Sequence, residues 1–244
     1  MYGTVTIDCF PESINRYRKG YAIVAVDVIR ATTSAVTAVA MGRRCYPVSS
    51  LEKALQLKAE LKDALMVGEL EGEMPEGFDM NNSPAELALR TDLARPMILL
   101  STTGSKLICE AGKCEVAYIA CLRDYSSVAR HLAGRYPRIA IIGAGSRGEF
   151  REEDQMCCAW IAEDLTEAGY EPQDDSTVKI IERWSHAPPD AFTNGNSVRY
   201  LTRSGQLKDL EFILTHINDL NEAFLVRDDQ IVVAPEEKQK EVVM

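Results

Sequence analysis

The feature that most limits the fold of this chain is a series of short, wholly apolar runs, each followed by a segment rich in helix formers. The strongest runs are Tyr21–Val26, Met97–Leu100 and Ile139–Ile142, and Leu65–Glu69 adds one that ends in an acid. A strand that is apolar on both faces is buried between two layers, as in parallel sheets covered by helices. The sequence therefore predicts a three-layer α/β/α fold with a mostly parallel or mixed sheet, which could be built from two similar halves.

The domain organisation is predicted to be simple. The 244 residues contain no low-complexity linker, so we expect one α/β domain over residues 1–235 and a charged tail, predicted to fray, over 236–244. The pattern is weaker in the C-terminal third. There we predict a strand at Val178–Ile181, helices at Ser197–Arg203 and Leu207–Ile217, and a hairpin formed by Ala223–Val226 and Ile231–Val233.

Composition excludes several classes of function. A net charge of −10 argues against nucleic acid as a partner, and no run approaches the ~18 apolar residues of a membrane span. The N-terminus lacks the basic start of a signal peptide. Seven cysteines without a CxxC pair indicate reduced thiols. We therefore predict a cytoplasmic protein with no membrane partner; a homo-oligomer is possible.

Polar residues gather where the first strong strand meets its helix. Asp27 follows Tyr21–Val26, and Arg30 and two threonines precede an Ala/Val-rich segment that ends near Gly42. Thr32 or Thr33 is expected to cap this helix. Ligands of open α/β sheets bind at the carboxyl ends of strands, and helix N-termini favour anions. The alternative is a helix cap with a surface ion pair, and this stretch alone leaves both interpretations open.

Similar chemistry recurs at the other strand ends. Glu69 follows one strand, Ser83 and Pro84 begin a helix after a loop, and a hydroxyl-rich turn over residues 101–105 follows Met97–Leu100. Such hydroxyls, backbone N–H groups and arginine suit an oxyanion. The residues expected to bind substrate are Thr32, Thr33, Asn82, Ser83, Ser101, Thr102, Thr103, Gly104, Ser105 and Gly145.

The glycine-rich segment Gly143–Gly148 matches GxGxxG, so a dinucleotide site has to be considered. Four acids follow at once, between Glu149 and Asp154, where a pyrophosphate would lie. They would repel a phosphate but suit a divalent cation such as Mg²⁺, which prefers oxygen ligands. We therefore predict Asp27, Glu69 and Asp154 as metal ligands, direct or through water, and Asp27, Arg30 and Asp154 as catalytic residues.

These stretches together resemble the 2-phosphosulfolactate phosphatase family of coenzyme M biosynthesis. The resemblance rests on DVIRATT at 27–33, Gly68-Glu69, the GFD and NSPAE segments between Gly77 and Glu86, Ser101–Ser105, and Gly143–Asp154. It implies an α/β/α fold, Mg²⁺ dependence and hydrolysis of a small anionic phosphoester to sulfolactate and phosphate.

Five positions depart from the family pattern: Leu70 where Arg is frequent, Asn81 for Gly, Thr103 for Asn, Ser105 for Thr, and Trp160 for Gly. Leu cannot offer the bidentate fork by which Arg recognises a sulfonate or carboxylate, so the substrate is less fixed than the chemistry. A different phosphoester, or a non-catalytic anion-binding protein, are the alternatives. The nucleophile is expected to be a metal-activated water, with covalent attack by Asp27 or a hydroxyl left open.

Overall fold

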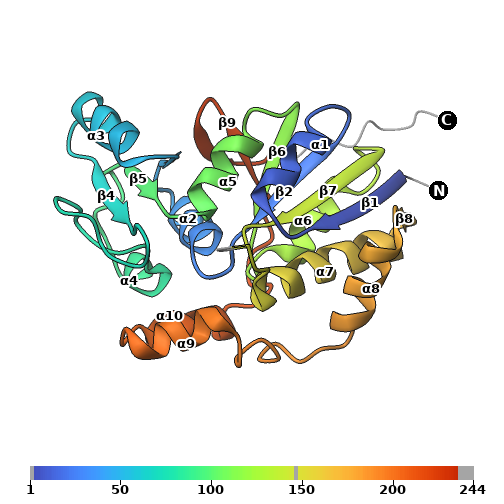
Figure 1. The fold of residues 1–244 in the computed structure, drawn as a ribbon. Coiled ribbons are helices and arrows are strands. Elements are labelled where there is room, and N and C mark those ends of the chain that lie inside the picture. The colour runs from blue at the N-terminus through green and yellow to red at the C-terminus, as the bar shows by residue number, and fades with distance from the viewer. Residues whose placement is uncertain (1–2, 146–147, 236–244) are drawn as a thin grey trace.

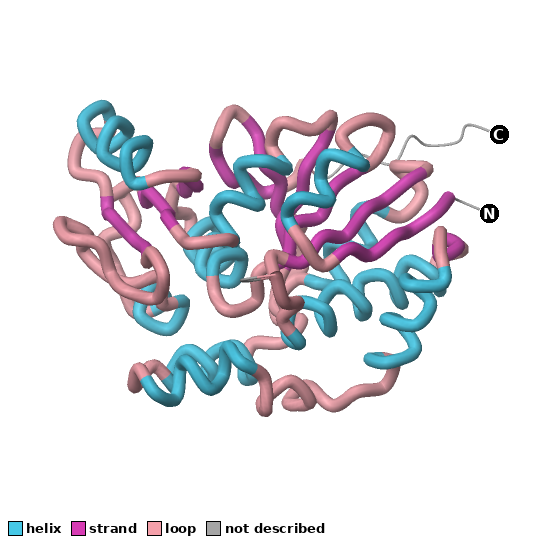
Figure 2. The backbone as a smooth tube through the Cα atoms, viewed as in Figure 1, coloured by secondary structure: helices cyan, strands magenta, loops and turns pink. Residues whose placement is uncertain are grey.

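The computed structural model describes residues 3–145 and 148–235, and all ten strands of this part form one sheet (Figure 1). Helices cover both faces, so the predicted three-layer α/β fold is confirmed (Figure 2). The strand order is β4-β5-β3-β10-β9-β6-β2-β7-β1-β8. The strands are β1 Gly3–Asp8, β2 Ala22–Val26, β3 Cys45–Val48, β4 Leu65–Gly68, β5 Met97–Leu100, β6 Val116–Ala120, β7 Arg138–Gly143, β8 Tyr170–Pro172, β9 Phe224–Arg227 and β10 Gln230–Val233.

The helices fill the connections between these strands. They are the short η1 Pro11–Ser13 and α1 Ile14–Tyr17, then α2 Ala31–Ala40, α3 Leu51–Glu60, α4 Pro84–Ala88, α5 Gly104–Ala111, α6 Tyr125–Leu132, α7 Glu152–Glu167, α8 Asp175–Trp184, α9 Asn196–Arg203 and α10 Leu207–Thr215. Within the described residues, no helix combines the length and the apolar character that a bilayer crossing requires. The tail predicted at 236–244 lies outside the described residues.

The sheet has two parallel parts of unequal size, so the predicted mixed sheet is confirmed. One part contains β6, β2, β7, β1 and β8, and the other contains β3, β5 and β4. The hairpin β9–β10 joins them, because β9 is antiparallel to β6 and β10 is antiparallel to β3. Figure 1 shows α2 lying between the two parts. The ends of strands from both parts can therefore reach one central region.

The central strand β2 explains why its sequence is apolar throughout. Ala22, Val24 and Val26 pack into a core shared with α6 and α7. Ile23 and Ala25 point to the other face, into a core shared with α2 and α5. Successive side chains of a strand point to opposite faces, so a strand between two helical layers needs apolar residues at every position.

Helix α2 is buried along most of its length, from Ala31 to Ala38. It ends beside Gly42, whose φ of +91° suits glycine, and this end is as predicted. The predicted capping residue is wrong. Arg30 occupies the N-cap position, so Thr32 and Thr33 lie inside the first turn and cap nothing. Their hydroxyls bond to backbone groups of the preceding turn instead, as described below.

The C-terminal third contains a clear error of secondary structure. Residues 178–181, predicted as a strand, lie inside helix α8. The Asp174 side chain caps this helix by accepting a hydrogen bond from the N–H of Thr177. Thr177 and Trp184, two turns apart, are buried on one face, so the apolar residues follow a helical period. The helices near Ser197 and Leu207 and the hairpin are confirmed.

Candidate active site

The turns after β2, β4 and β5 and the first turn of α7 lie together, although they come from both parts of the sheet. Asp27 follows β2 and touches the first residue of α5: a Cβ added at Gly104 would lie 1.8 Å from the Oδ2 atom of Asp27. The N–H of Val28 donates to Oδ1 of Asp154 at 2.7 Å. Glu69 is near enough for its charge to act on Asp27. The structure thus brings the predicted acids into one region.

Asp27 is a buried acid with like charges around it. Burial raises the pKa of Asp27 to about 7; the N–H of Ala31 opposes this rise, and the charges of Glu69 and Glu153 add to it. The positive charge of Arg30 offsets part of the effect. Several carboxylates that share a buried place disfavour one another's ionisation. Strongly perturbed acids of this kind are typical of functional sites.

Two further acids lie in the first turn of α7. Burial raises the pKa of Asp154 well above its usual range, and the charges of Asp27 and Glu153 raise it further. Burial also raises the pKa of Glu153, and nearby Ser197 offsets only part of that rise. Neither carboxylate oxygen of Glu153 has a hydrogen-bond partner within the described residues. The charge of Glu153 raises the pKa of both Asp27 and Asp154, so Glu153 lies with the predicted acids although the sequence prediction did not include it.

Glu69 has a different environment. Its carboxylate accepts from the N–H of Thr102 at 2.7 Å, from the Thr102 hydroxyl at 2.8 Å and from the N–H of Gly72 at 2.7 Å. These bonds tie the turn after β4 to the turn after β5. Glu69 therefore holds two of the predicted segments in place, and its carboxylate is already well satisfied by hydrogen bonds.

The small hydroxyl residues mostly brace the turns in which they lie. The Thr32 hydroxyl donates to the carbonyl of Asp27 at 2.7 Å, and the Thr33 hydroxyl donates to the carbonyl of Val28 at the same distance. Ser101 and Ser105 exchange bonds, each N–H donating to the other's Oγ at 2.8 Å. All four side chains are buried. Thr103 takes the N-cap position of α5. Direct contact of any of these residues with a substrate stays a prediction.

Arg30 is buried in a polar cluster that includes residues far away in the sequence. Its Nη1 atom lies 2.5 Å from Oδ2 of Asp209 in α10 and also donates to Gln206, and its Nη2 atom donates to Asn81 at 3.0 Å. Asn81 is one of the departures from the family pattern, and here it orients Arg30. Neighbouring Ser83 caps α4, as predicted, and also donates to Asp209. Asn82 is buried, and its Oδ1 has no hydrogen-bond partner in the described ranges.

Gly145 follows β7 with a φ of +53°, and a Cβ there would lie 2.7 Å from the carbonyl oxygen of Cys9. Glycine thus lets this turn approach the end of β1 closely. Nearby, a cavity of about 550 Å³ borders the first turn of α7. Its lining includes Phe10, Arg151, Glu152 and Arg199. The cavity adjoins Gly195, which also approaches the buried Glu153.

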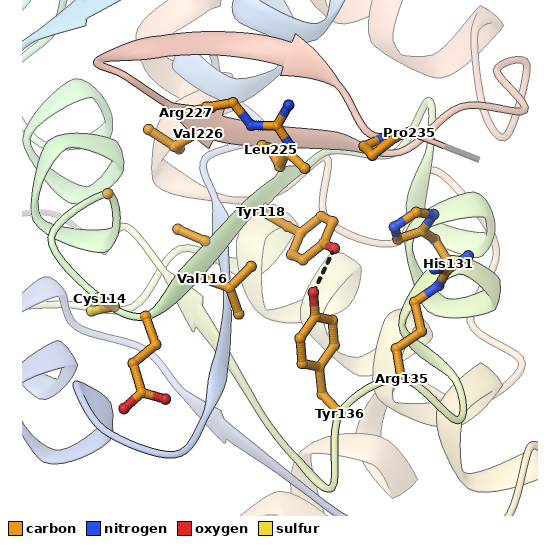
Figure 3. A pocket seen from close by; sticks show the side chains of 13 residues that line it. Cys114, Val116, Tyr118, His131, Arg135, Tyr136, Leu225, Val226, Arg227 and Pro235 are labelled. Atoms are coloured by element: carbon orange, nitrogen blue, oxygen red, sulfur yellow. Dashed lines mark hydrogen bonds between the residues drawn. The ribbon is translucent and has the colours of Figure 1, made fainter. Parts of the chain in front are cut away.

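A second cavity, of about 350 Å³, lies at the amino end of β6, far along the strand from the acids (Figure 3). Tyr118 and Tyr136 meet there at 3.1 Å between their hydroxyls, and Arg135 and Arg227 also contribute to its lining. None of the residues predicted to be catalytic lines it. The chemistry predicted from the sequence thus belongs to the carboxyl ends of the strands.

The acids of the site suit Mg²⁺ only in part. Within residues 3–145 and 148–235, no group of three or more His, Cys, Asp or Glu side chains is close enough together to hold a metal ion. Asp27, Glu69 and Asp154 therefore do not form a complete set of metal ligands by themselves. Mg²⁺ usually takes one or two carboxylates and completes its shell with waters and substrate phosphate. Asp27 and Asp154, with raised pKa values, and the unpartnered Glu153 suit a cation of this kind. Metal binding stays a prediction.

The fold and the site define a class: an α/β protein with buried acids, hydroxyl-rich turns and one oriented arginine at the carboxyl ends of its strands. The family model described as 2-phosphosulpholactate phosphatase matches residues 9–221, and the chain belongs to that family.

Individual relatives agree with this assignment, and each carries the name probable 2-phosphosulfolactate phosphatase. A protein of Caldanaerobacter subterraneus subsp. tengcongensis is 30% identical over 210 residues, which cover 83% of this chain and 87% of the relative. One from Carboxydothermus hydrogenoformans is 30% identical, over 83% and 85% of the two chains. One from Symbiobacterium thermophilum is 31% identical, over 79% and 86%.

The sequence did not predict three residues of this region, Glu153, Asn81 and Asp209, and the reason differs for each. Glu153 is adjacent to Asp154, so only knowledge of which helix face turns inward would have separated it from the exposed acids nearby. Asn81 departs from the family pattern and gave no positive signal. Asp209 lies in the C-terminal third, where no motif indicates a link to Arg30.

Proposed function

We propose that this protein is a Mg²⁺-dependent phosphatase that hydrolyses the phosphate ester of 2-phosphosulfolactate to sulfolactate and phosphate. The observation that carries the proposal is the convergence of Asp27, Glu153 and Asp154, three buried acids with raised pKa values, beside the turn over residues 101–105. Membership of the phosphatase family supports the reaction type, and the names of the relatives support the substrate.

Each part of the site has a task in this chemistry. Asp27 and Asp154 would hold the cation, with Glu153 beside them. When bound, Mg²⁺ would neutralise phosphate charge and lower the pKa of a water. Arg30 would direct its remaining N–H donors at an oxyanion, since the observed contacts use only part of its fork. Covalent attack by Asp27 or by a hydroxyl is the alternative route.

The anionic end of the substrate needs positive charge from somewhere other than position 70. Leu70 packs against the small core formed by Met66, Phe78 and their neighbours, so it serves packing. Arg151 and Arg199 line the cavity beside α7, and we propose that they receive the sulfonate or carboxylate. A site built this way would accept small polyanions in general, which keeps a different phosphoester as the alternative substrate.

The test is a panel of phosphorylated hydroxy acids, assayed with Mg²⁺ and after thorough chelation. We expect the fastest turnover with 2-phosphosulfolactate, and loss of activity with EDTA that Mg²⁺ or Mn²⁺ restores. A preference for another phosphoester would change the proposed substrate but leave the proposed reaction standing. No turnover of any phosphoester, with binding of phosphate retained, would favour the non-catalytic alternative. Full activity of metal-free protein would contradict the metal proposal.

The proposed cellular setting follows from the cysteines and from the substrate. All seven cysteines are free thiols, which supports a reducing, cytoplasmic location, and the substrate would place the enzyme in coenzyme M biosynthesis. The net charge of −10 supports the prediction that nucleic acid is not a partner. A homo-oligomer stays a prediction, which light scattering would test.

A further inference from the structure

Asp209 is a fully buried acid from the C-terminal third of the chain that lies against Arg30. It lies in the first turn of α10, and none of its surface is exposed. A long loop over residues 185–195 leads from α8 to the α9–α10 pair, which lies beneath α4 and α2 in the view of Figures 1 and 2. Sequence distance is large, since Asp209 and Arg30 are 179 positions apart.

The two oxygens of Asp209 hold two different segments. Oδ2 pairs with Nη1 of Arg30 at 2.5 Å, in the turn that also carries Asp27. Oδ1 accepts from the Ser83 hydroxyl and, at 3.3 Å, from the N–H of Ala85, in the turn that begins α4. One carboxylate thus fixes the position of the turn after β2 relative to the turn that carries Asn82 and Ser83.

The neighbours of Asp209 complete the orientation of the guanidinium. Gln206, three residues earlier, accepts from the same Nη1 atom of Arg30, and Asn81 accepts from Nη2. A guanidinium has five N–H donors in a rigid plane, so contacts on two of its nitrogen atoms fix where the others point. A buried ion pair contributes little net stability compared with apolar packing but can specify one geometry.

We propose that Asp209 is a positioning residue. It orients Arg30 toward the phosphoryl group and holds the turns over 27–33 and 81–86 in a fixed relative position. This inference rests on the proposed function, because it gives Arg30 an oxyanion to contact. It also gives the C-terminal third a task in the proposed site, because α10 carries Asp209.

The main test is Asp209→Asn, with kcat and KM measured beside melting temperature. Asn keeps the volume and one acceptor for Ser83 and Ala85, but it removes the charge opposite Arg30. We expect kcat to fall at least tenfold, and we expect Asp209→Glu, which restores the charge, to recover part of the loss. The matched control is Asp92→Asn, which breaks the pair between buried Arg43 and Asp92 (2.7 Å) at the far end of β5. It should lower the melting temperature and leave kcat within twofold.

A double-mutant cycle separates positioning from general damage. If Asp209 acts through Arg30, Asp209→Asn should cost little in a protein that already carries Arg30→Lys. The inference would be overturned if the loss of kcat in the double variant equals the product of the two single losses. It would also be overturned if Asp209→Asn folds and keeps the kcat of the unaltered protein. If Asp209→Asn does not fold, Gln206→Met removes one acceptor of Arg30 from a half-buried position, and we expect kcat to fall about threefold. An unchanged kcat there would again overturn it.

Binding of inorganic phosphate keeps this inference separable from the proposed function. In calorimetry with phosphate as the probe, Asp209→Asn and Arg30→Lys should weaken binding alike, and Asp92→Asn should not. That result would support positioning even if the unaltered protein hydrolyses no phosphoester. Normal turnover together with unaltered phosphate binding in Asp209→Asn would overturn positioning and leave the phosphatase function standing.

Discussion

Two buried acids, Asp27 and Asp124, follow neighbouring strands and differ in what surrounds them. The strands β2 and β6 are paired in parallel, with Val26 opposite Ala120, and each is followed by a buried aspartate. Burial raises the pKa of both to about 7. At Asp124, Oδ1 accepts from the N–H of Cys121 at 2.8 Å, a bond within one turn. At Asp27, acids from other segments, Glu69 and Glu153, add to the rise.

The comparison shows that a buried acid after a strand is not by itself evidence of a site. Asp124 occupies the N-cap position of α6, and the charge that acts on its pKa is that of neighbouring Arg123, which lowers it. Asp27 is different because carboxylates from three separate segments repel one another around it. Such repulsion costs stability, and a cation or a catalytic task is the usual reason for keeping it.

The largest expected effect, and the sharpest test of this comparison, is the loss of activity in Asp27→Asn. The two side chains are nearly isosteric, but Asn removes one charge and one strong ligand oxygen. We expect kcat at saturating Mg²⁺ to fall by roughly 10³-fold or more, about 4 kcal/mol. The kcat of the unaltered protein in this variant would refute the site.

Asp124→Asn is the matched control for that substitution. It makes the same chemical change at a residue of similar burial, and the amide oxygen can still accept from Cys121. We expect kcat within about twofold of the unaltered enzyme, because no catalytic group depends on Asp124. A loss of kcat as large as that of Asp27→Asn would mean that the two acids do not differ in function. The site would then include the start of α6.

The next effect is smaller and concerns Arg30, the positively charged side chain of the site. Arg30→Lys keeps the charge but loses the planar fork that reaches Asp209, Gln206 and Asn81 together. We expect at least a tenfold loss of kcat/KM, about 1.4 kcal/mol, with a salt dependence of substrate capture. Normal kinetics would give Arg30 a purely structural role.

Much of the fold could be predicted because it depends on local patterns. The two-sided apolar runs identified β2, β4, β5 and β7, and Ser83 with Pro84 identified the start of α4. The segment at 178–181 was assigned wrongly, because four apolar and basic residues fit a strand as well as a helix. The helix is decided by the cap at Asp174 and by burial of Trp184, which only the packed chain reveals.

The site could be predicted only in part, for the same physical reason. Asp27 and Asp154 stand in recognisable motifs, whereas Asp209 and Asn81 matter through contacts with Arg30 across long stretches of chain. The sequence also suggested that Thr32 or Thr33 caps this helix, but their hydroxyls donate to the carbonyls of Asp27 and Val28 in the preceding turn. Which bond a hydroxyl forms depends on which residue takes the N-cap position, and here that residue is Arg30.

The third prediction concerns stability of metal-free protein as a function of pH. An unfolded chain loses the proton of an aspartate near pH 3.8, whereas folded Asp27 keeps it up to about pH 7. The folded state therefore binds more protons in this window, and the unaltered protein loses stability as pH rises through it. Asn does not titrate, so the advantage of Asp27→Asn in melting temperature should grow between about pH 4 and 7 and then stay constant, reaching at least about 3 °C.

Mg²⁺ distinguishes the two acids in this experiment. Asp124→Asn should show a pH-dependent gain of the same sign, since burial raises the pKa of Asp124 as well. Added Mg²⁺ should cancel or reverse the gain only for Asp27→Asn, because the ion stabilises the unaltered protein by mass action and binds the variant less well. A gain for Asp27→Asn that ignores Mg²⁺ would count against Asp27 as a ligand.

The smallest expected effect is at the amino end of β6, in the cavity of Figure 3. Tyr118→Phe removes the 3.1 Å contact between the hydroxyls of Tyr118 and Tyr136 and keeps the ring in the core. A hydrogen bond of this kind is worth about 1 kcal/mol, so we expect a fall in melting temperature of roughly 2–4 °C. Activity should not change, because the cavity is separated from Asp27 by the length of the strand. Urea unfolding and kcat of the same preparation test both halves of this forecast. A change in kcat without a change in stability would mean that the two ends of β6 are coupled, and the contrast between an active carboxyl end and an inert amino end would have to be abandoned.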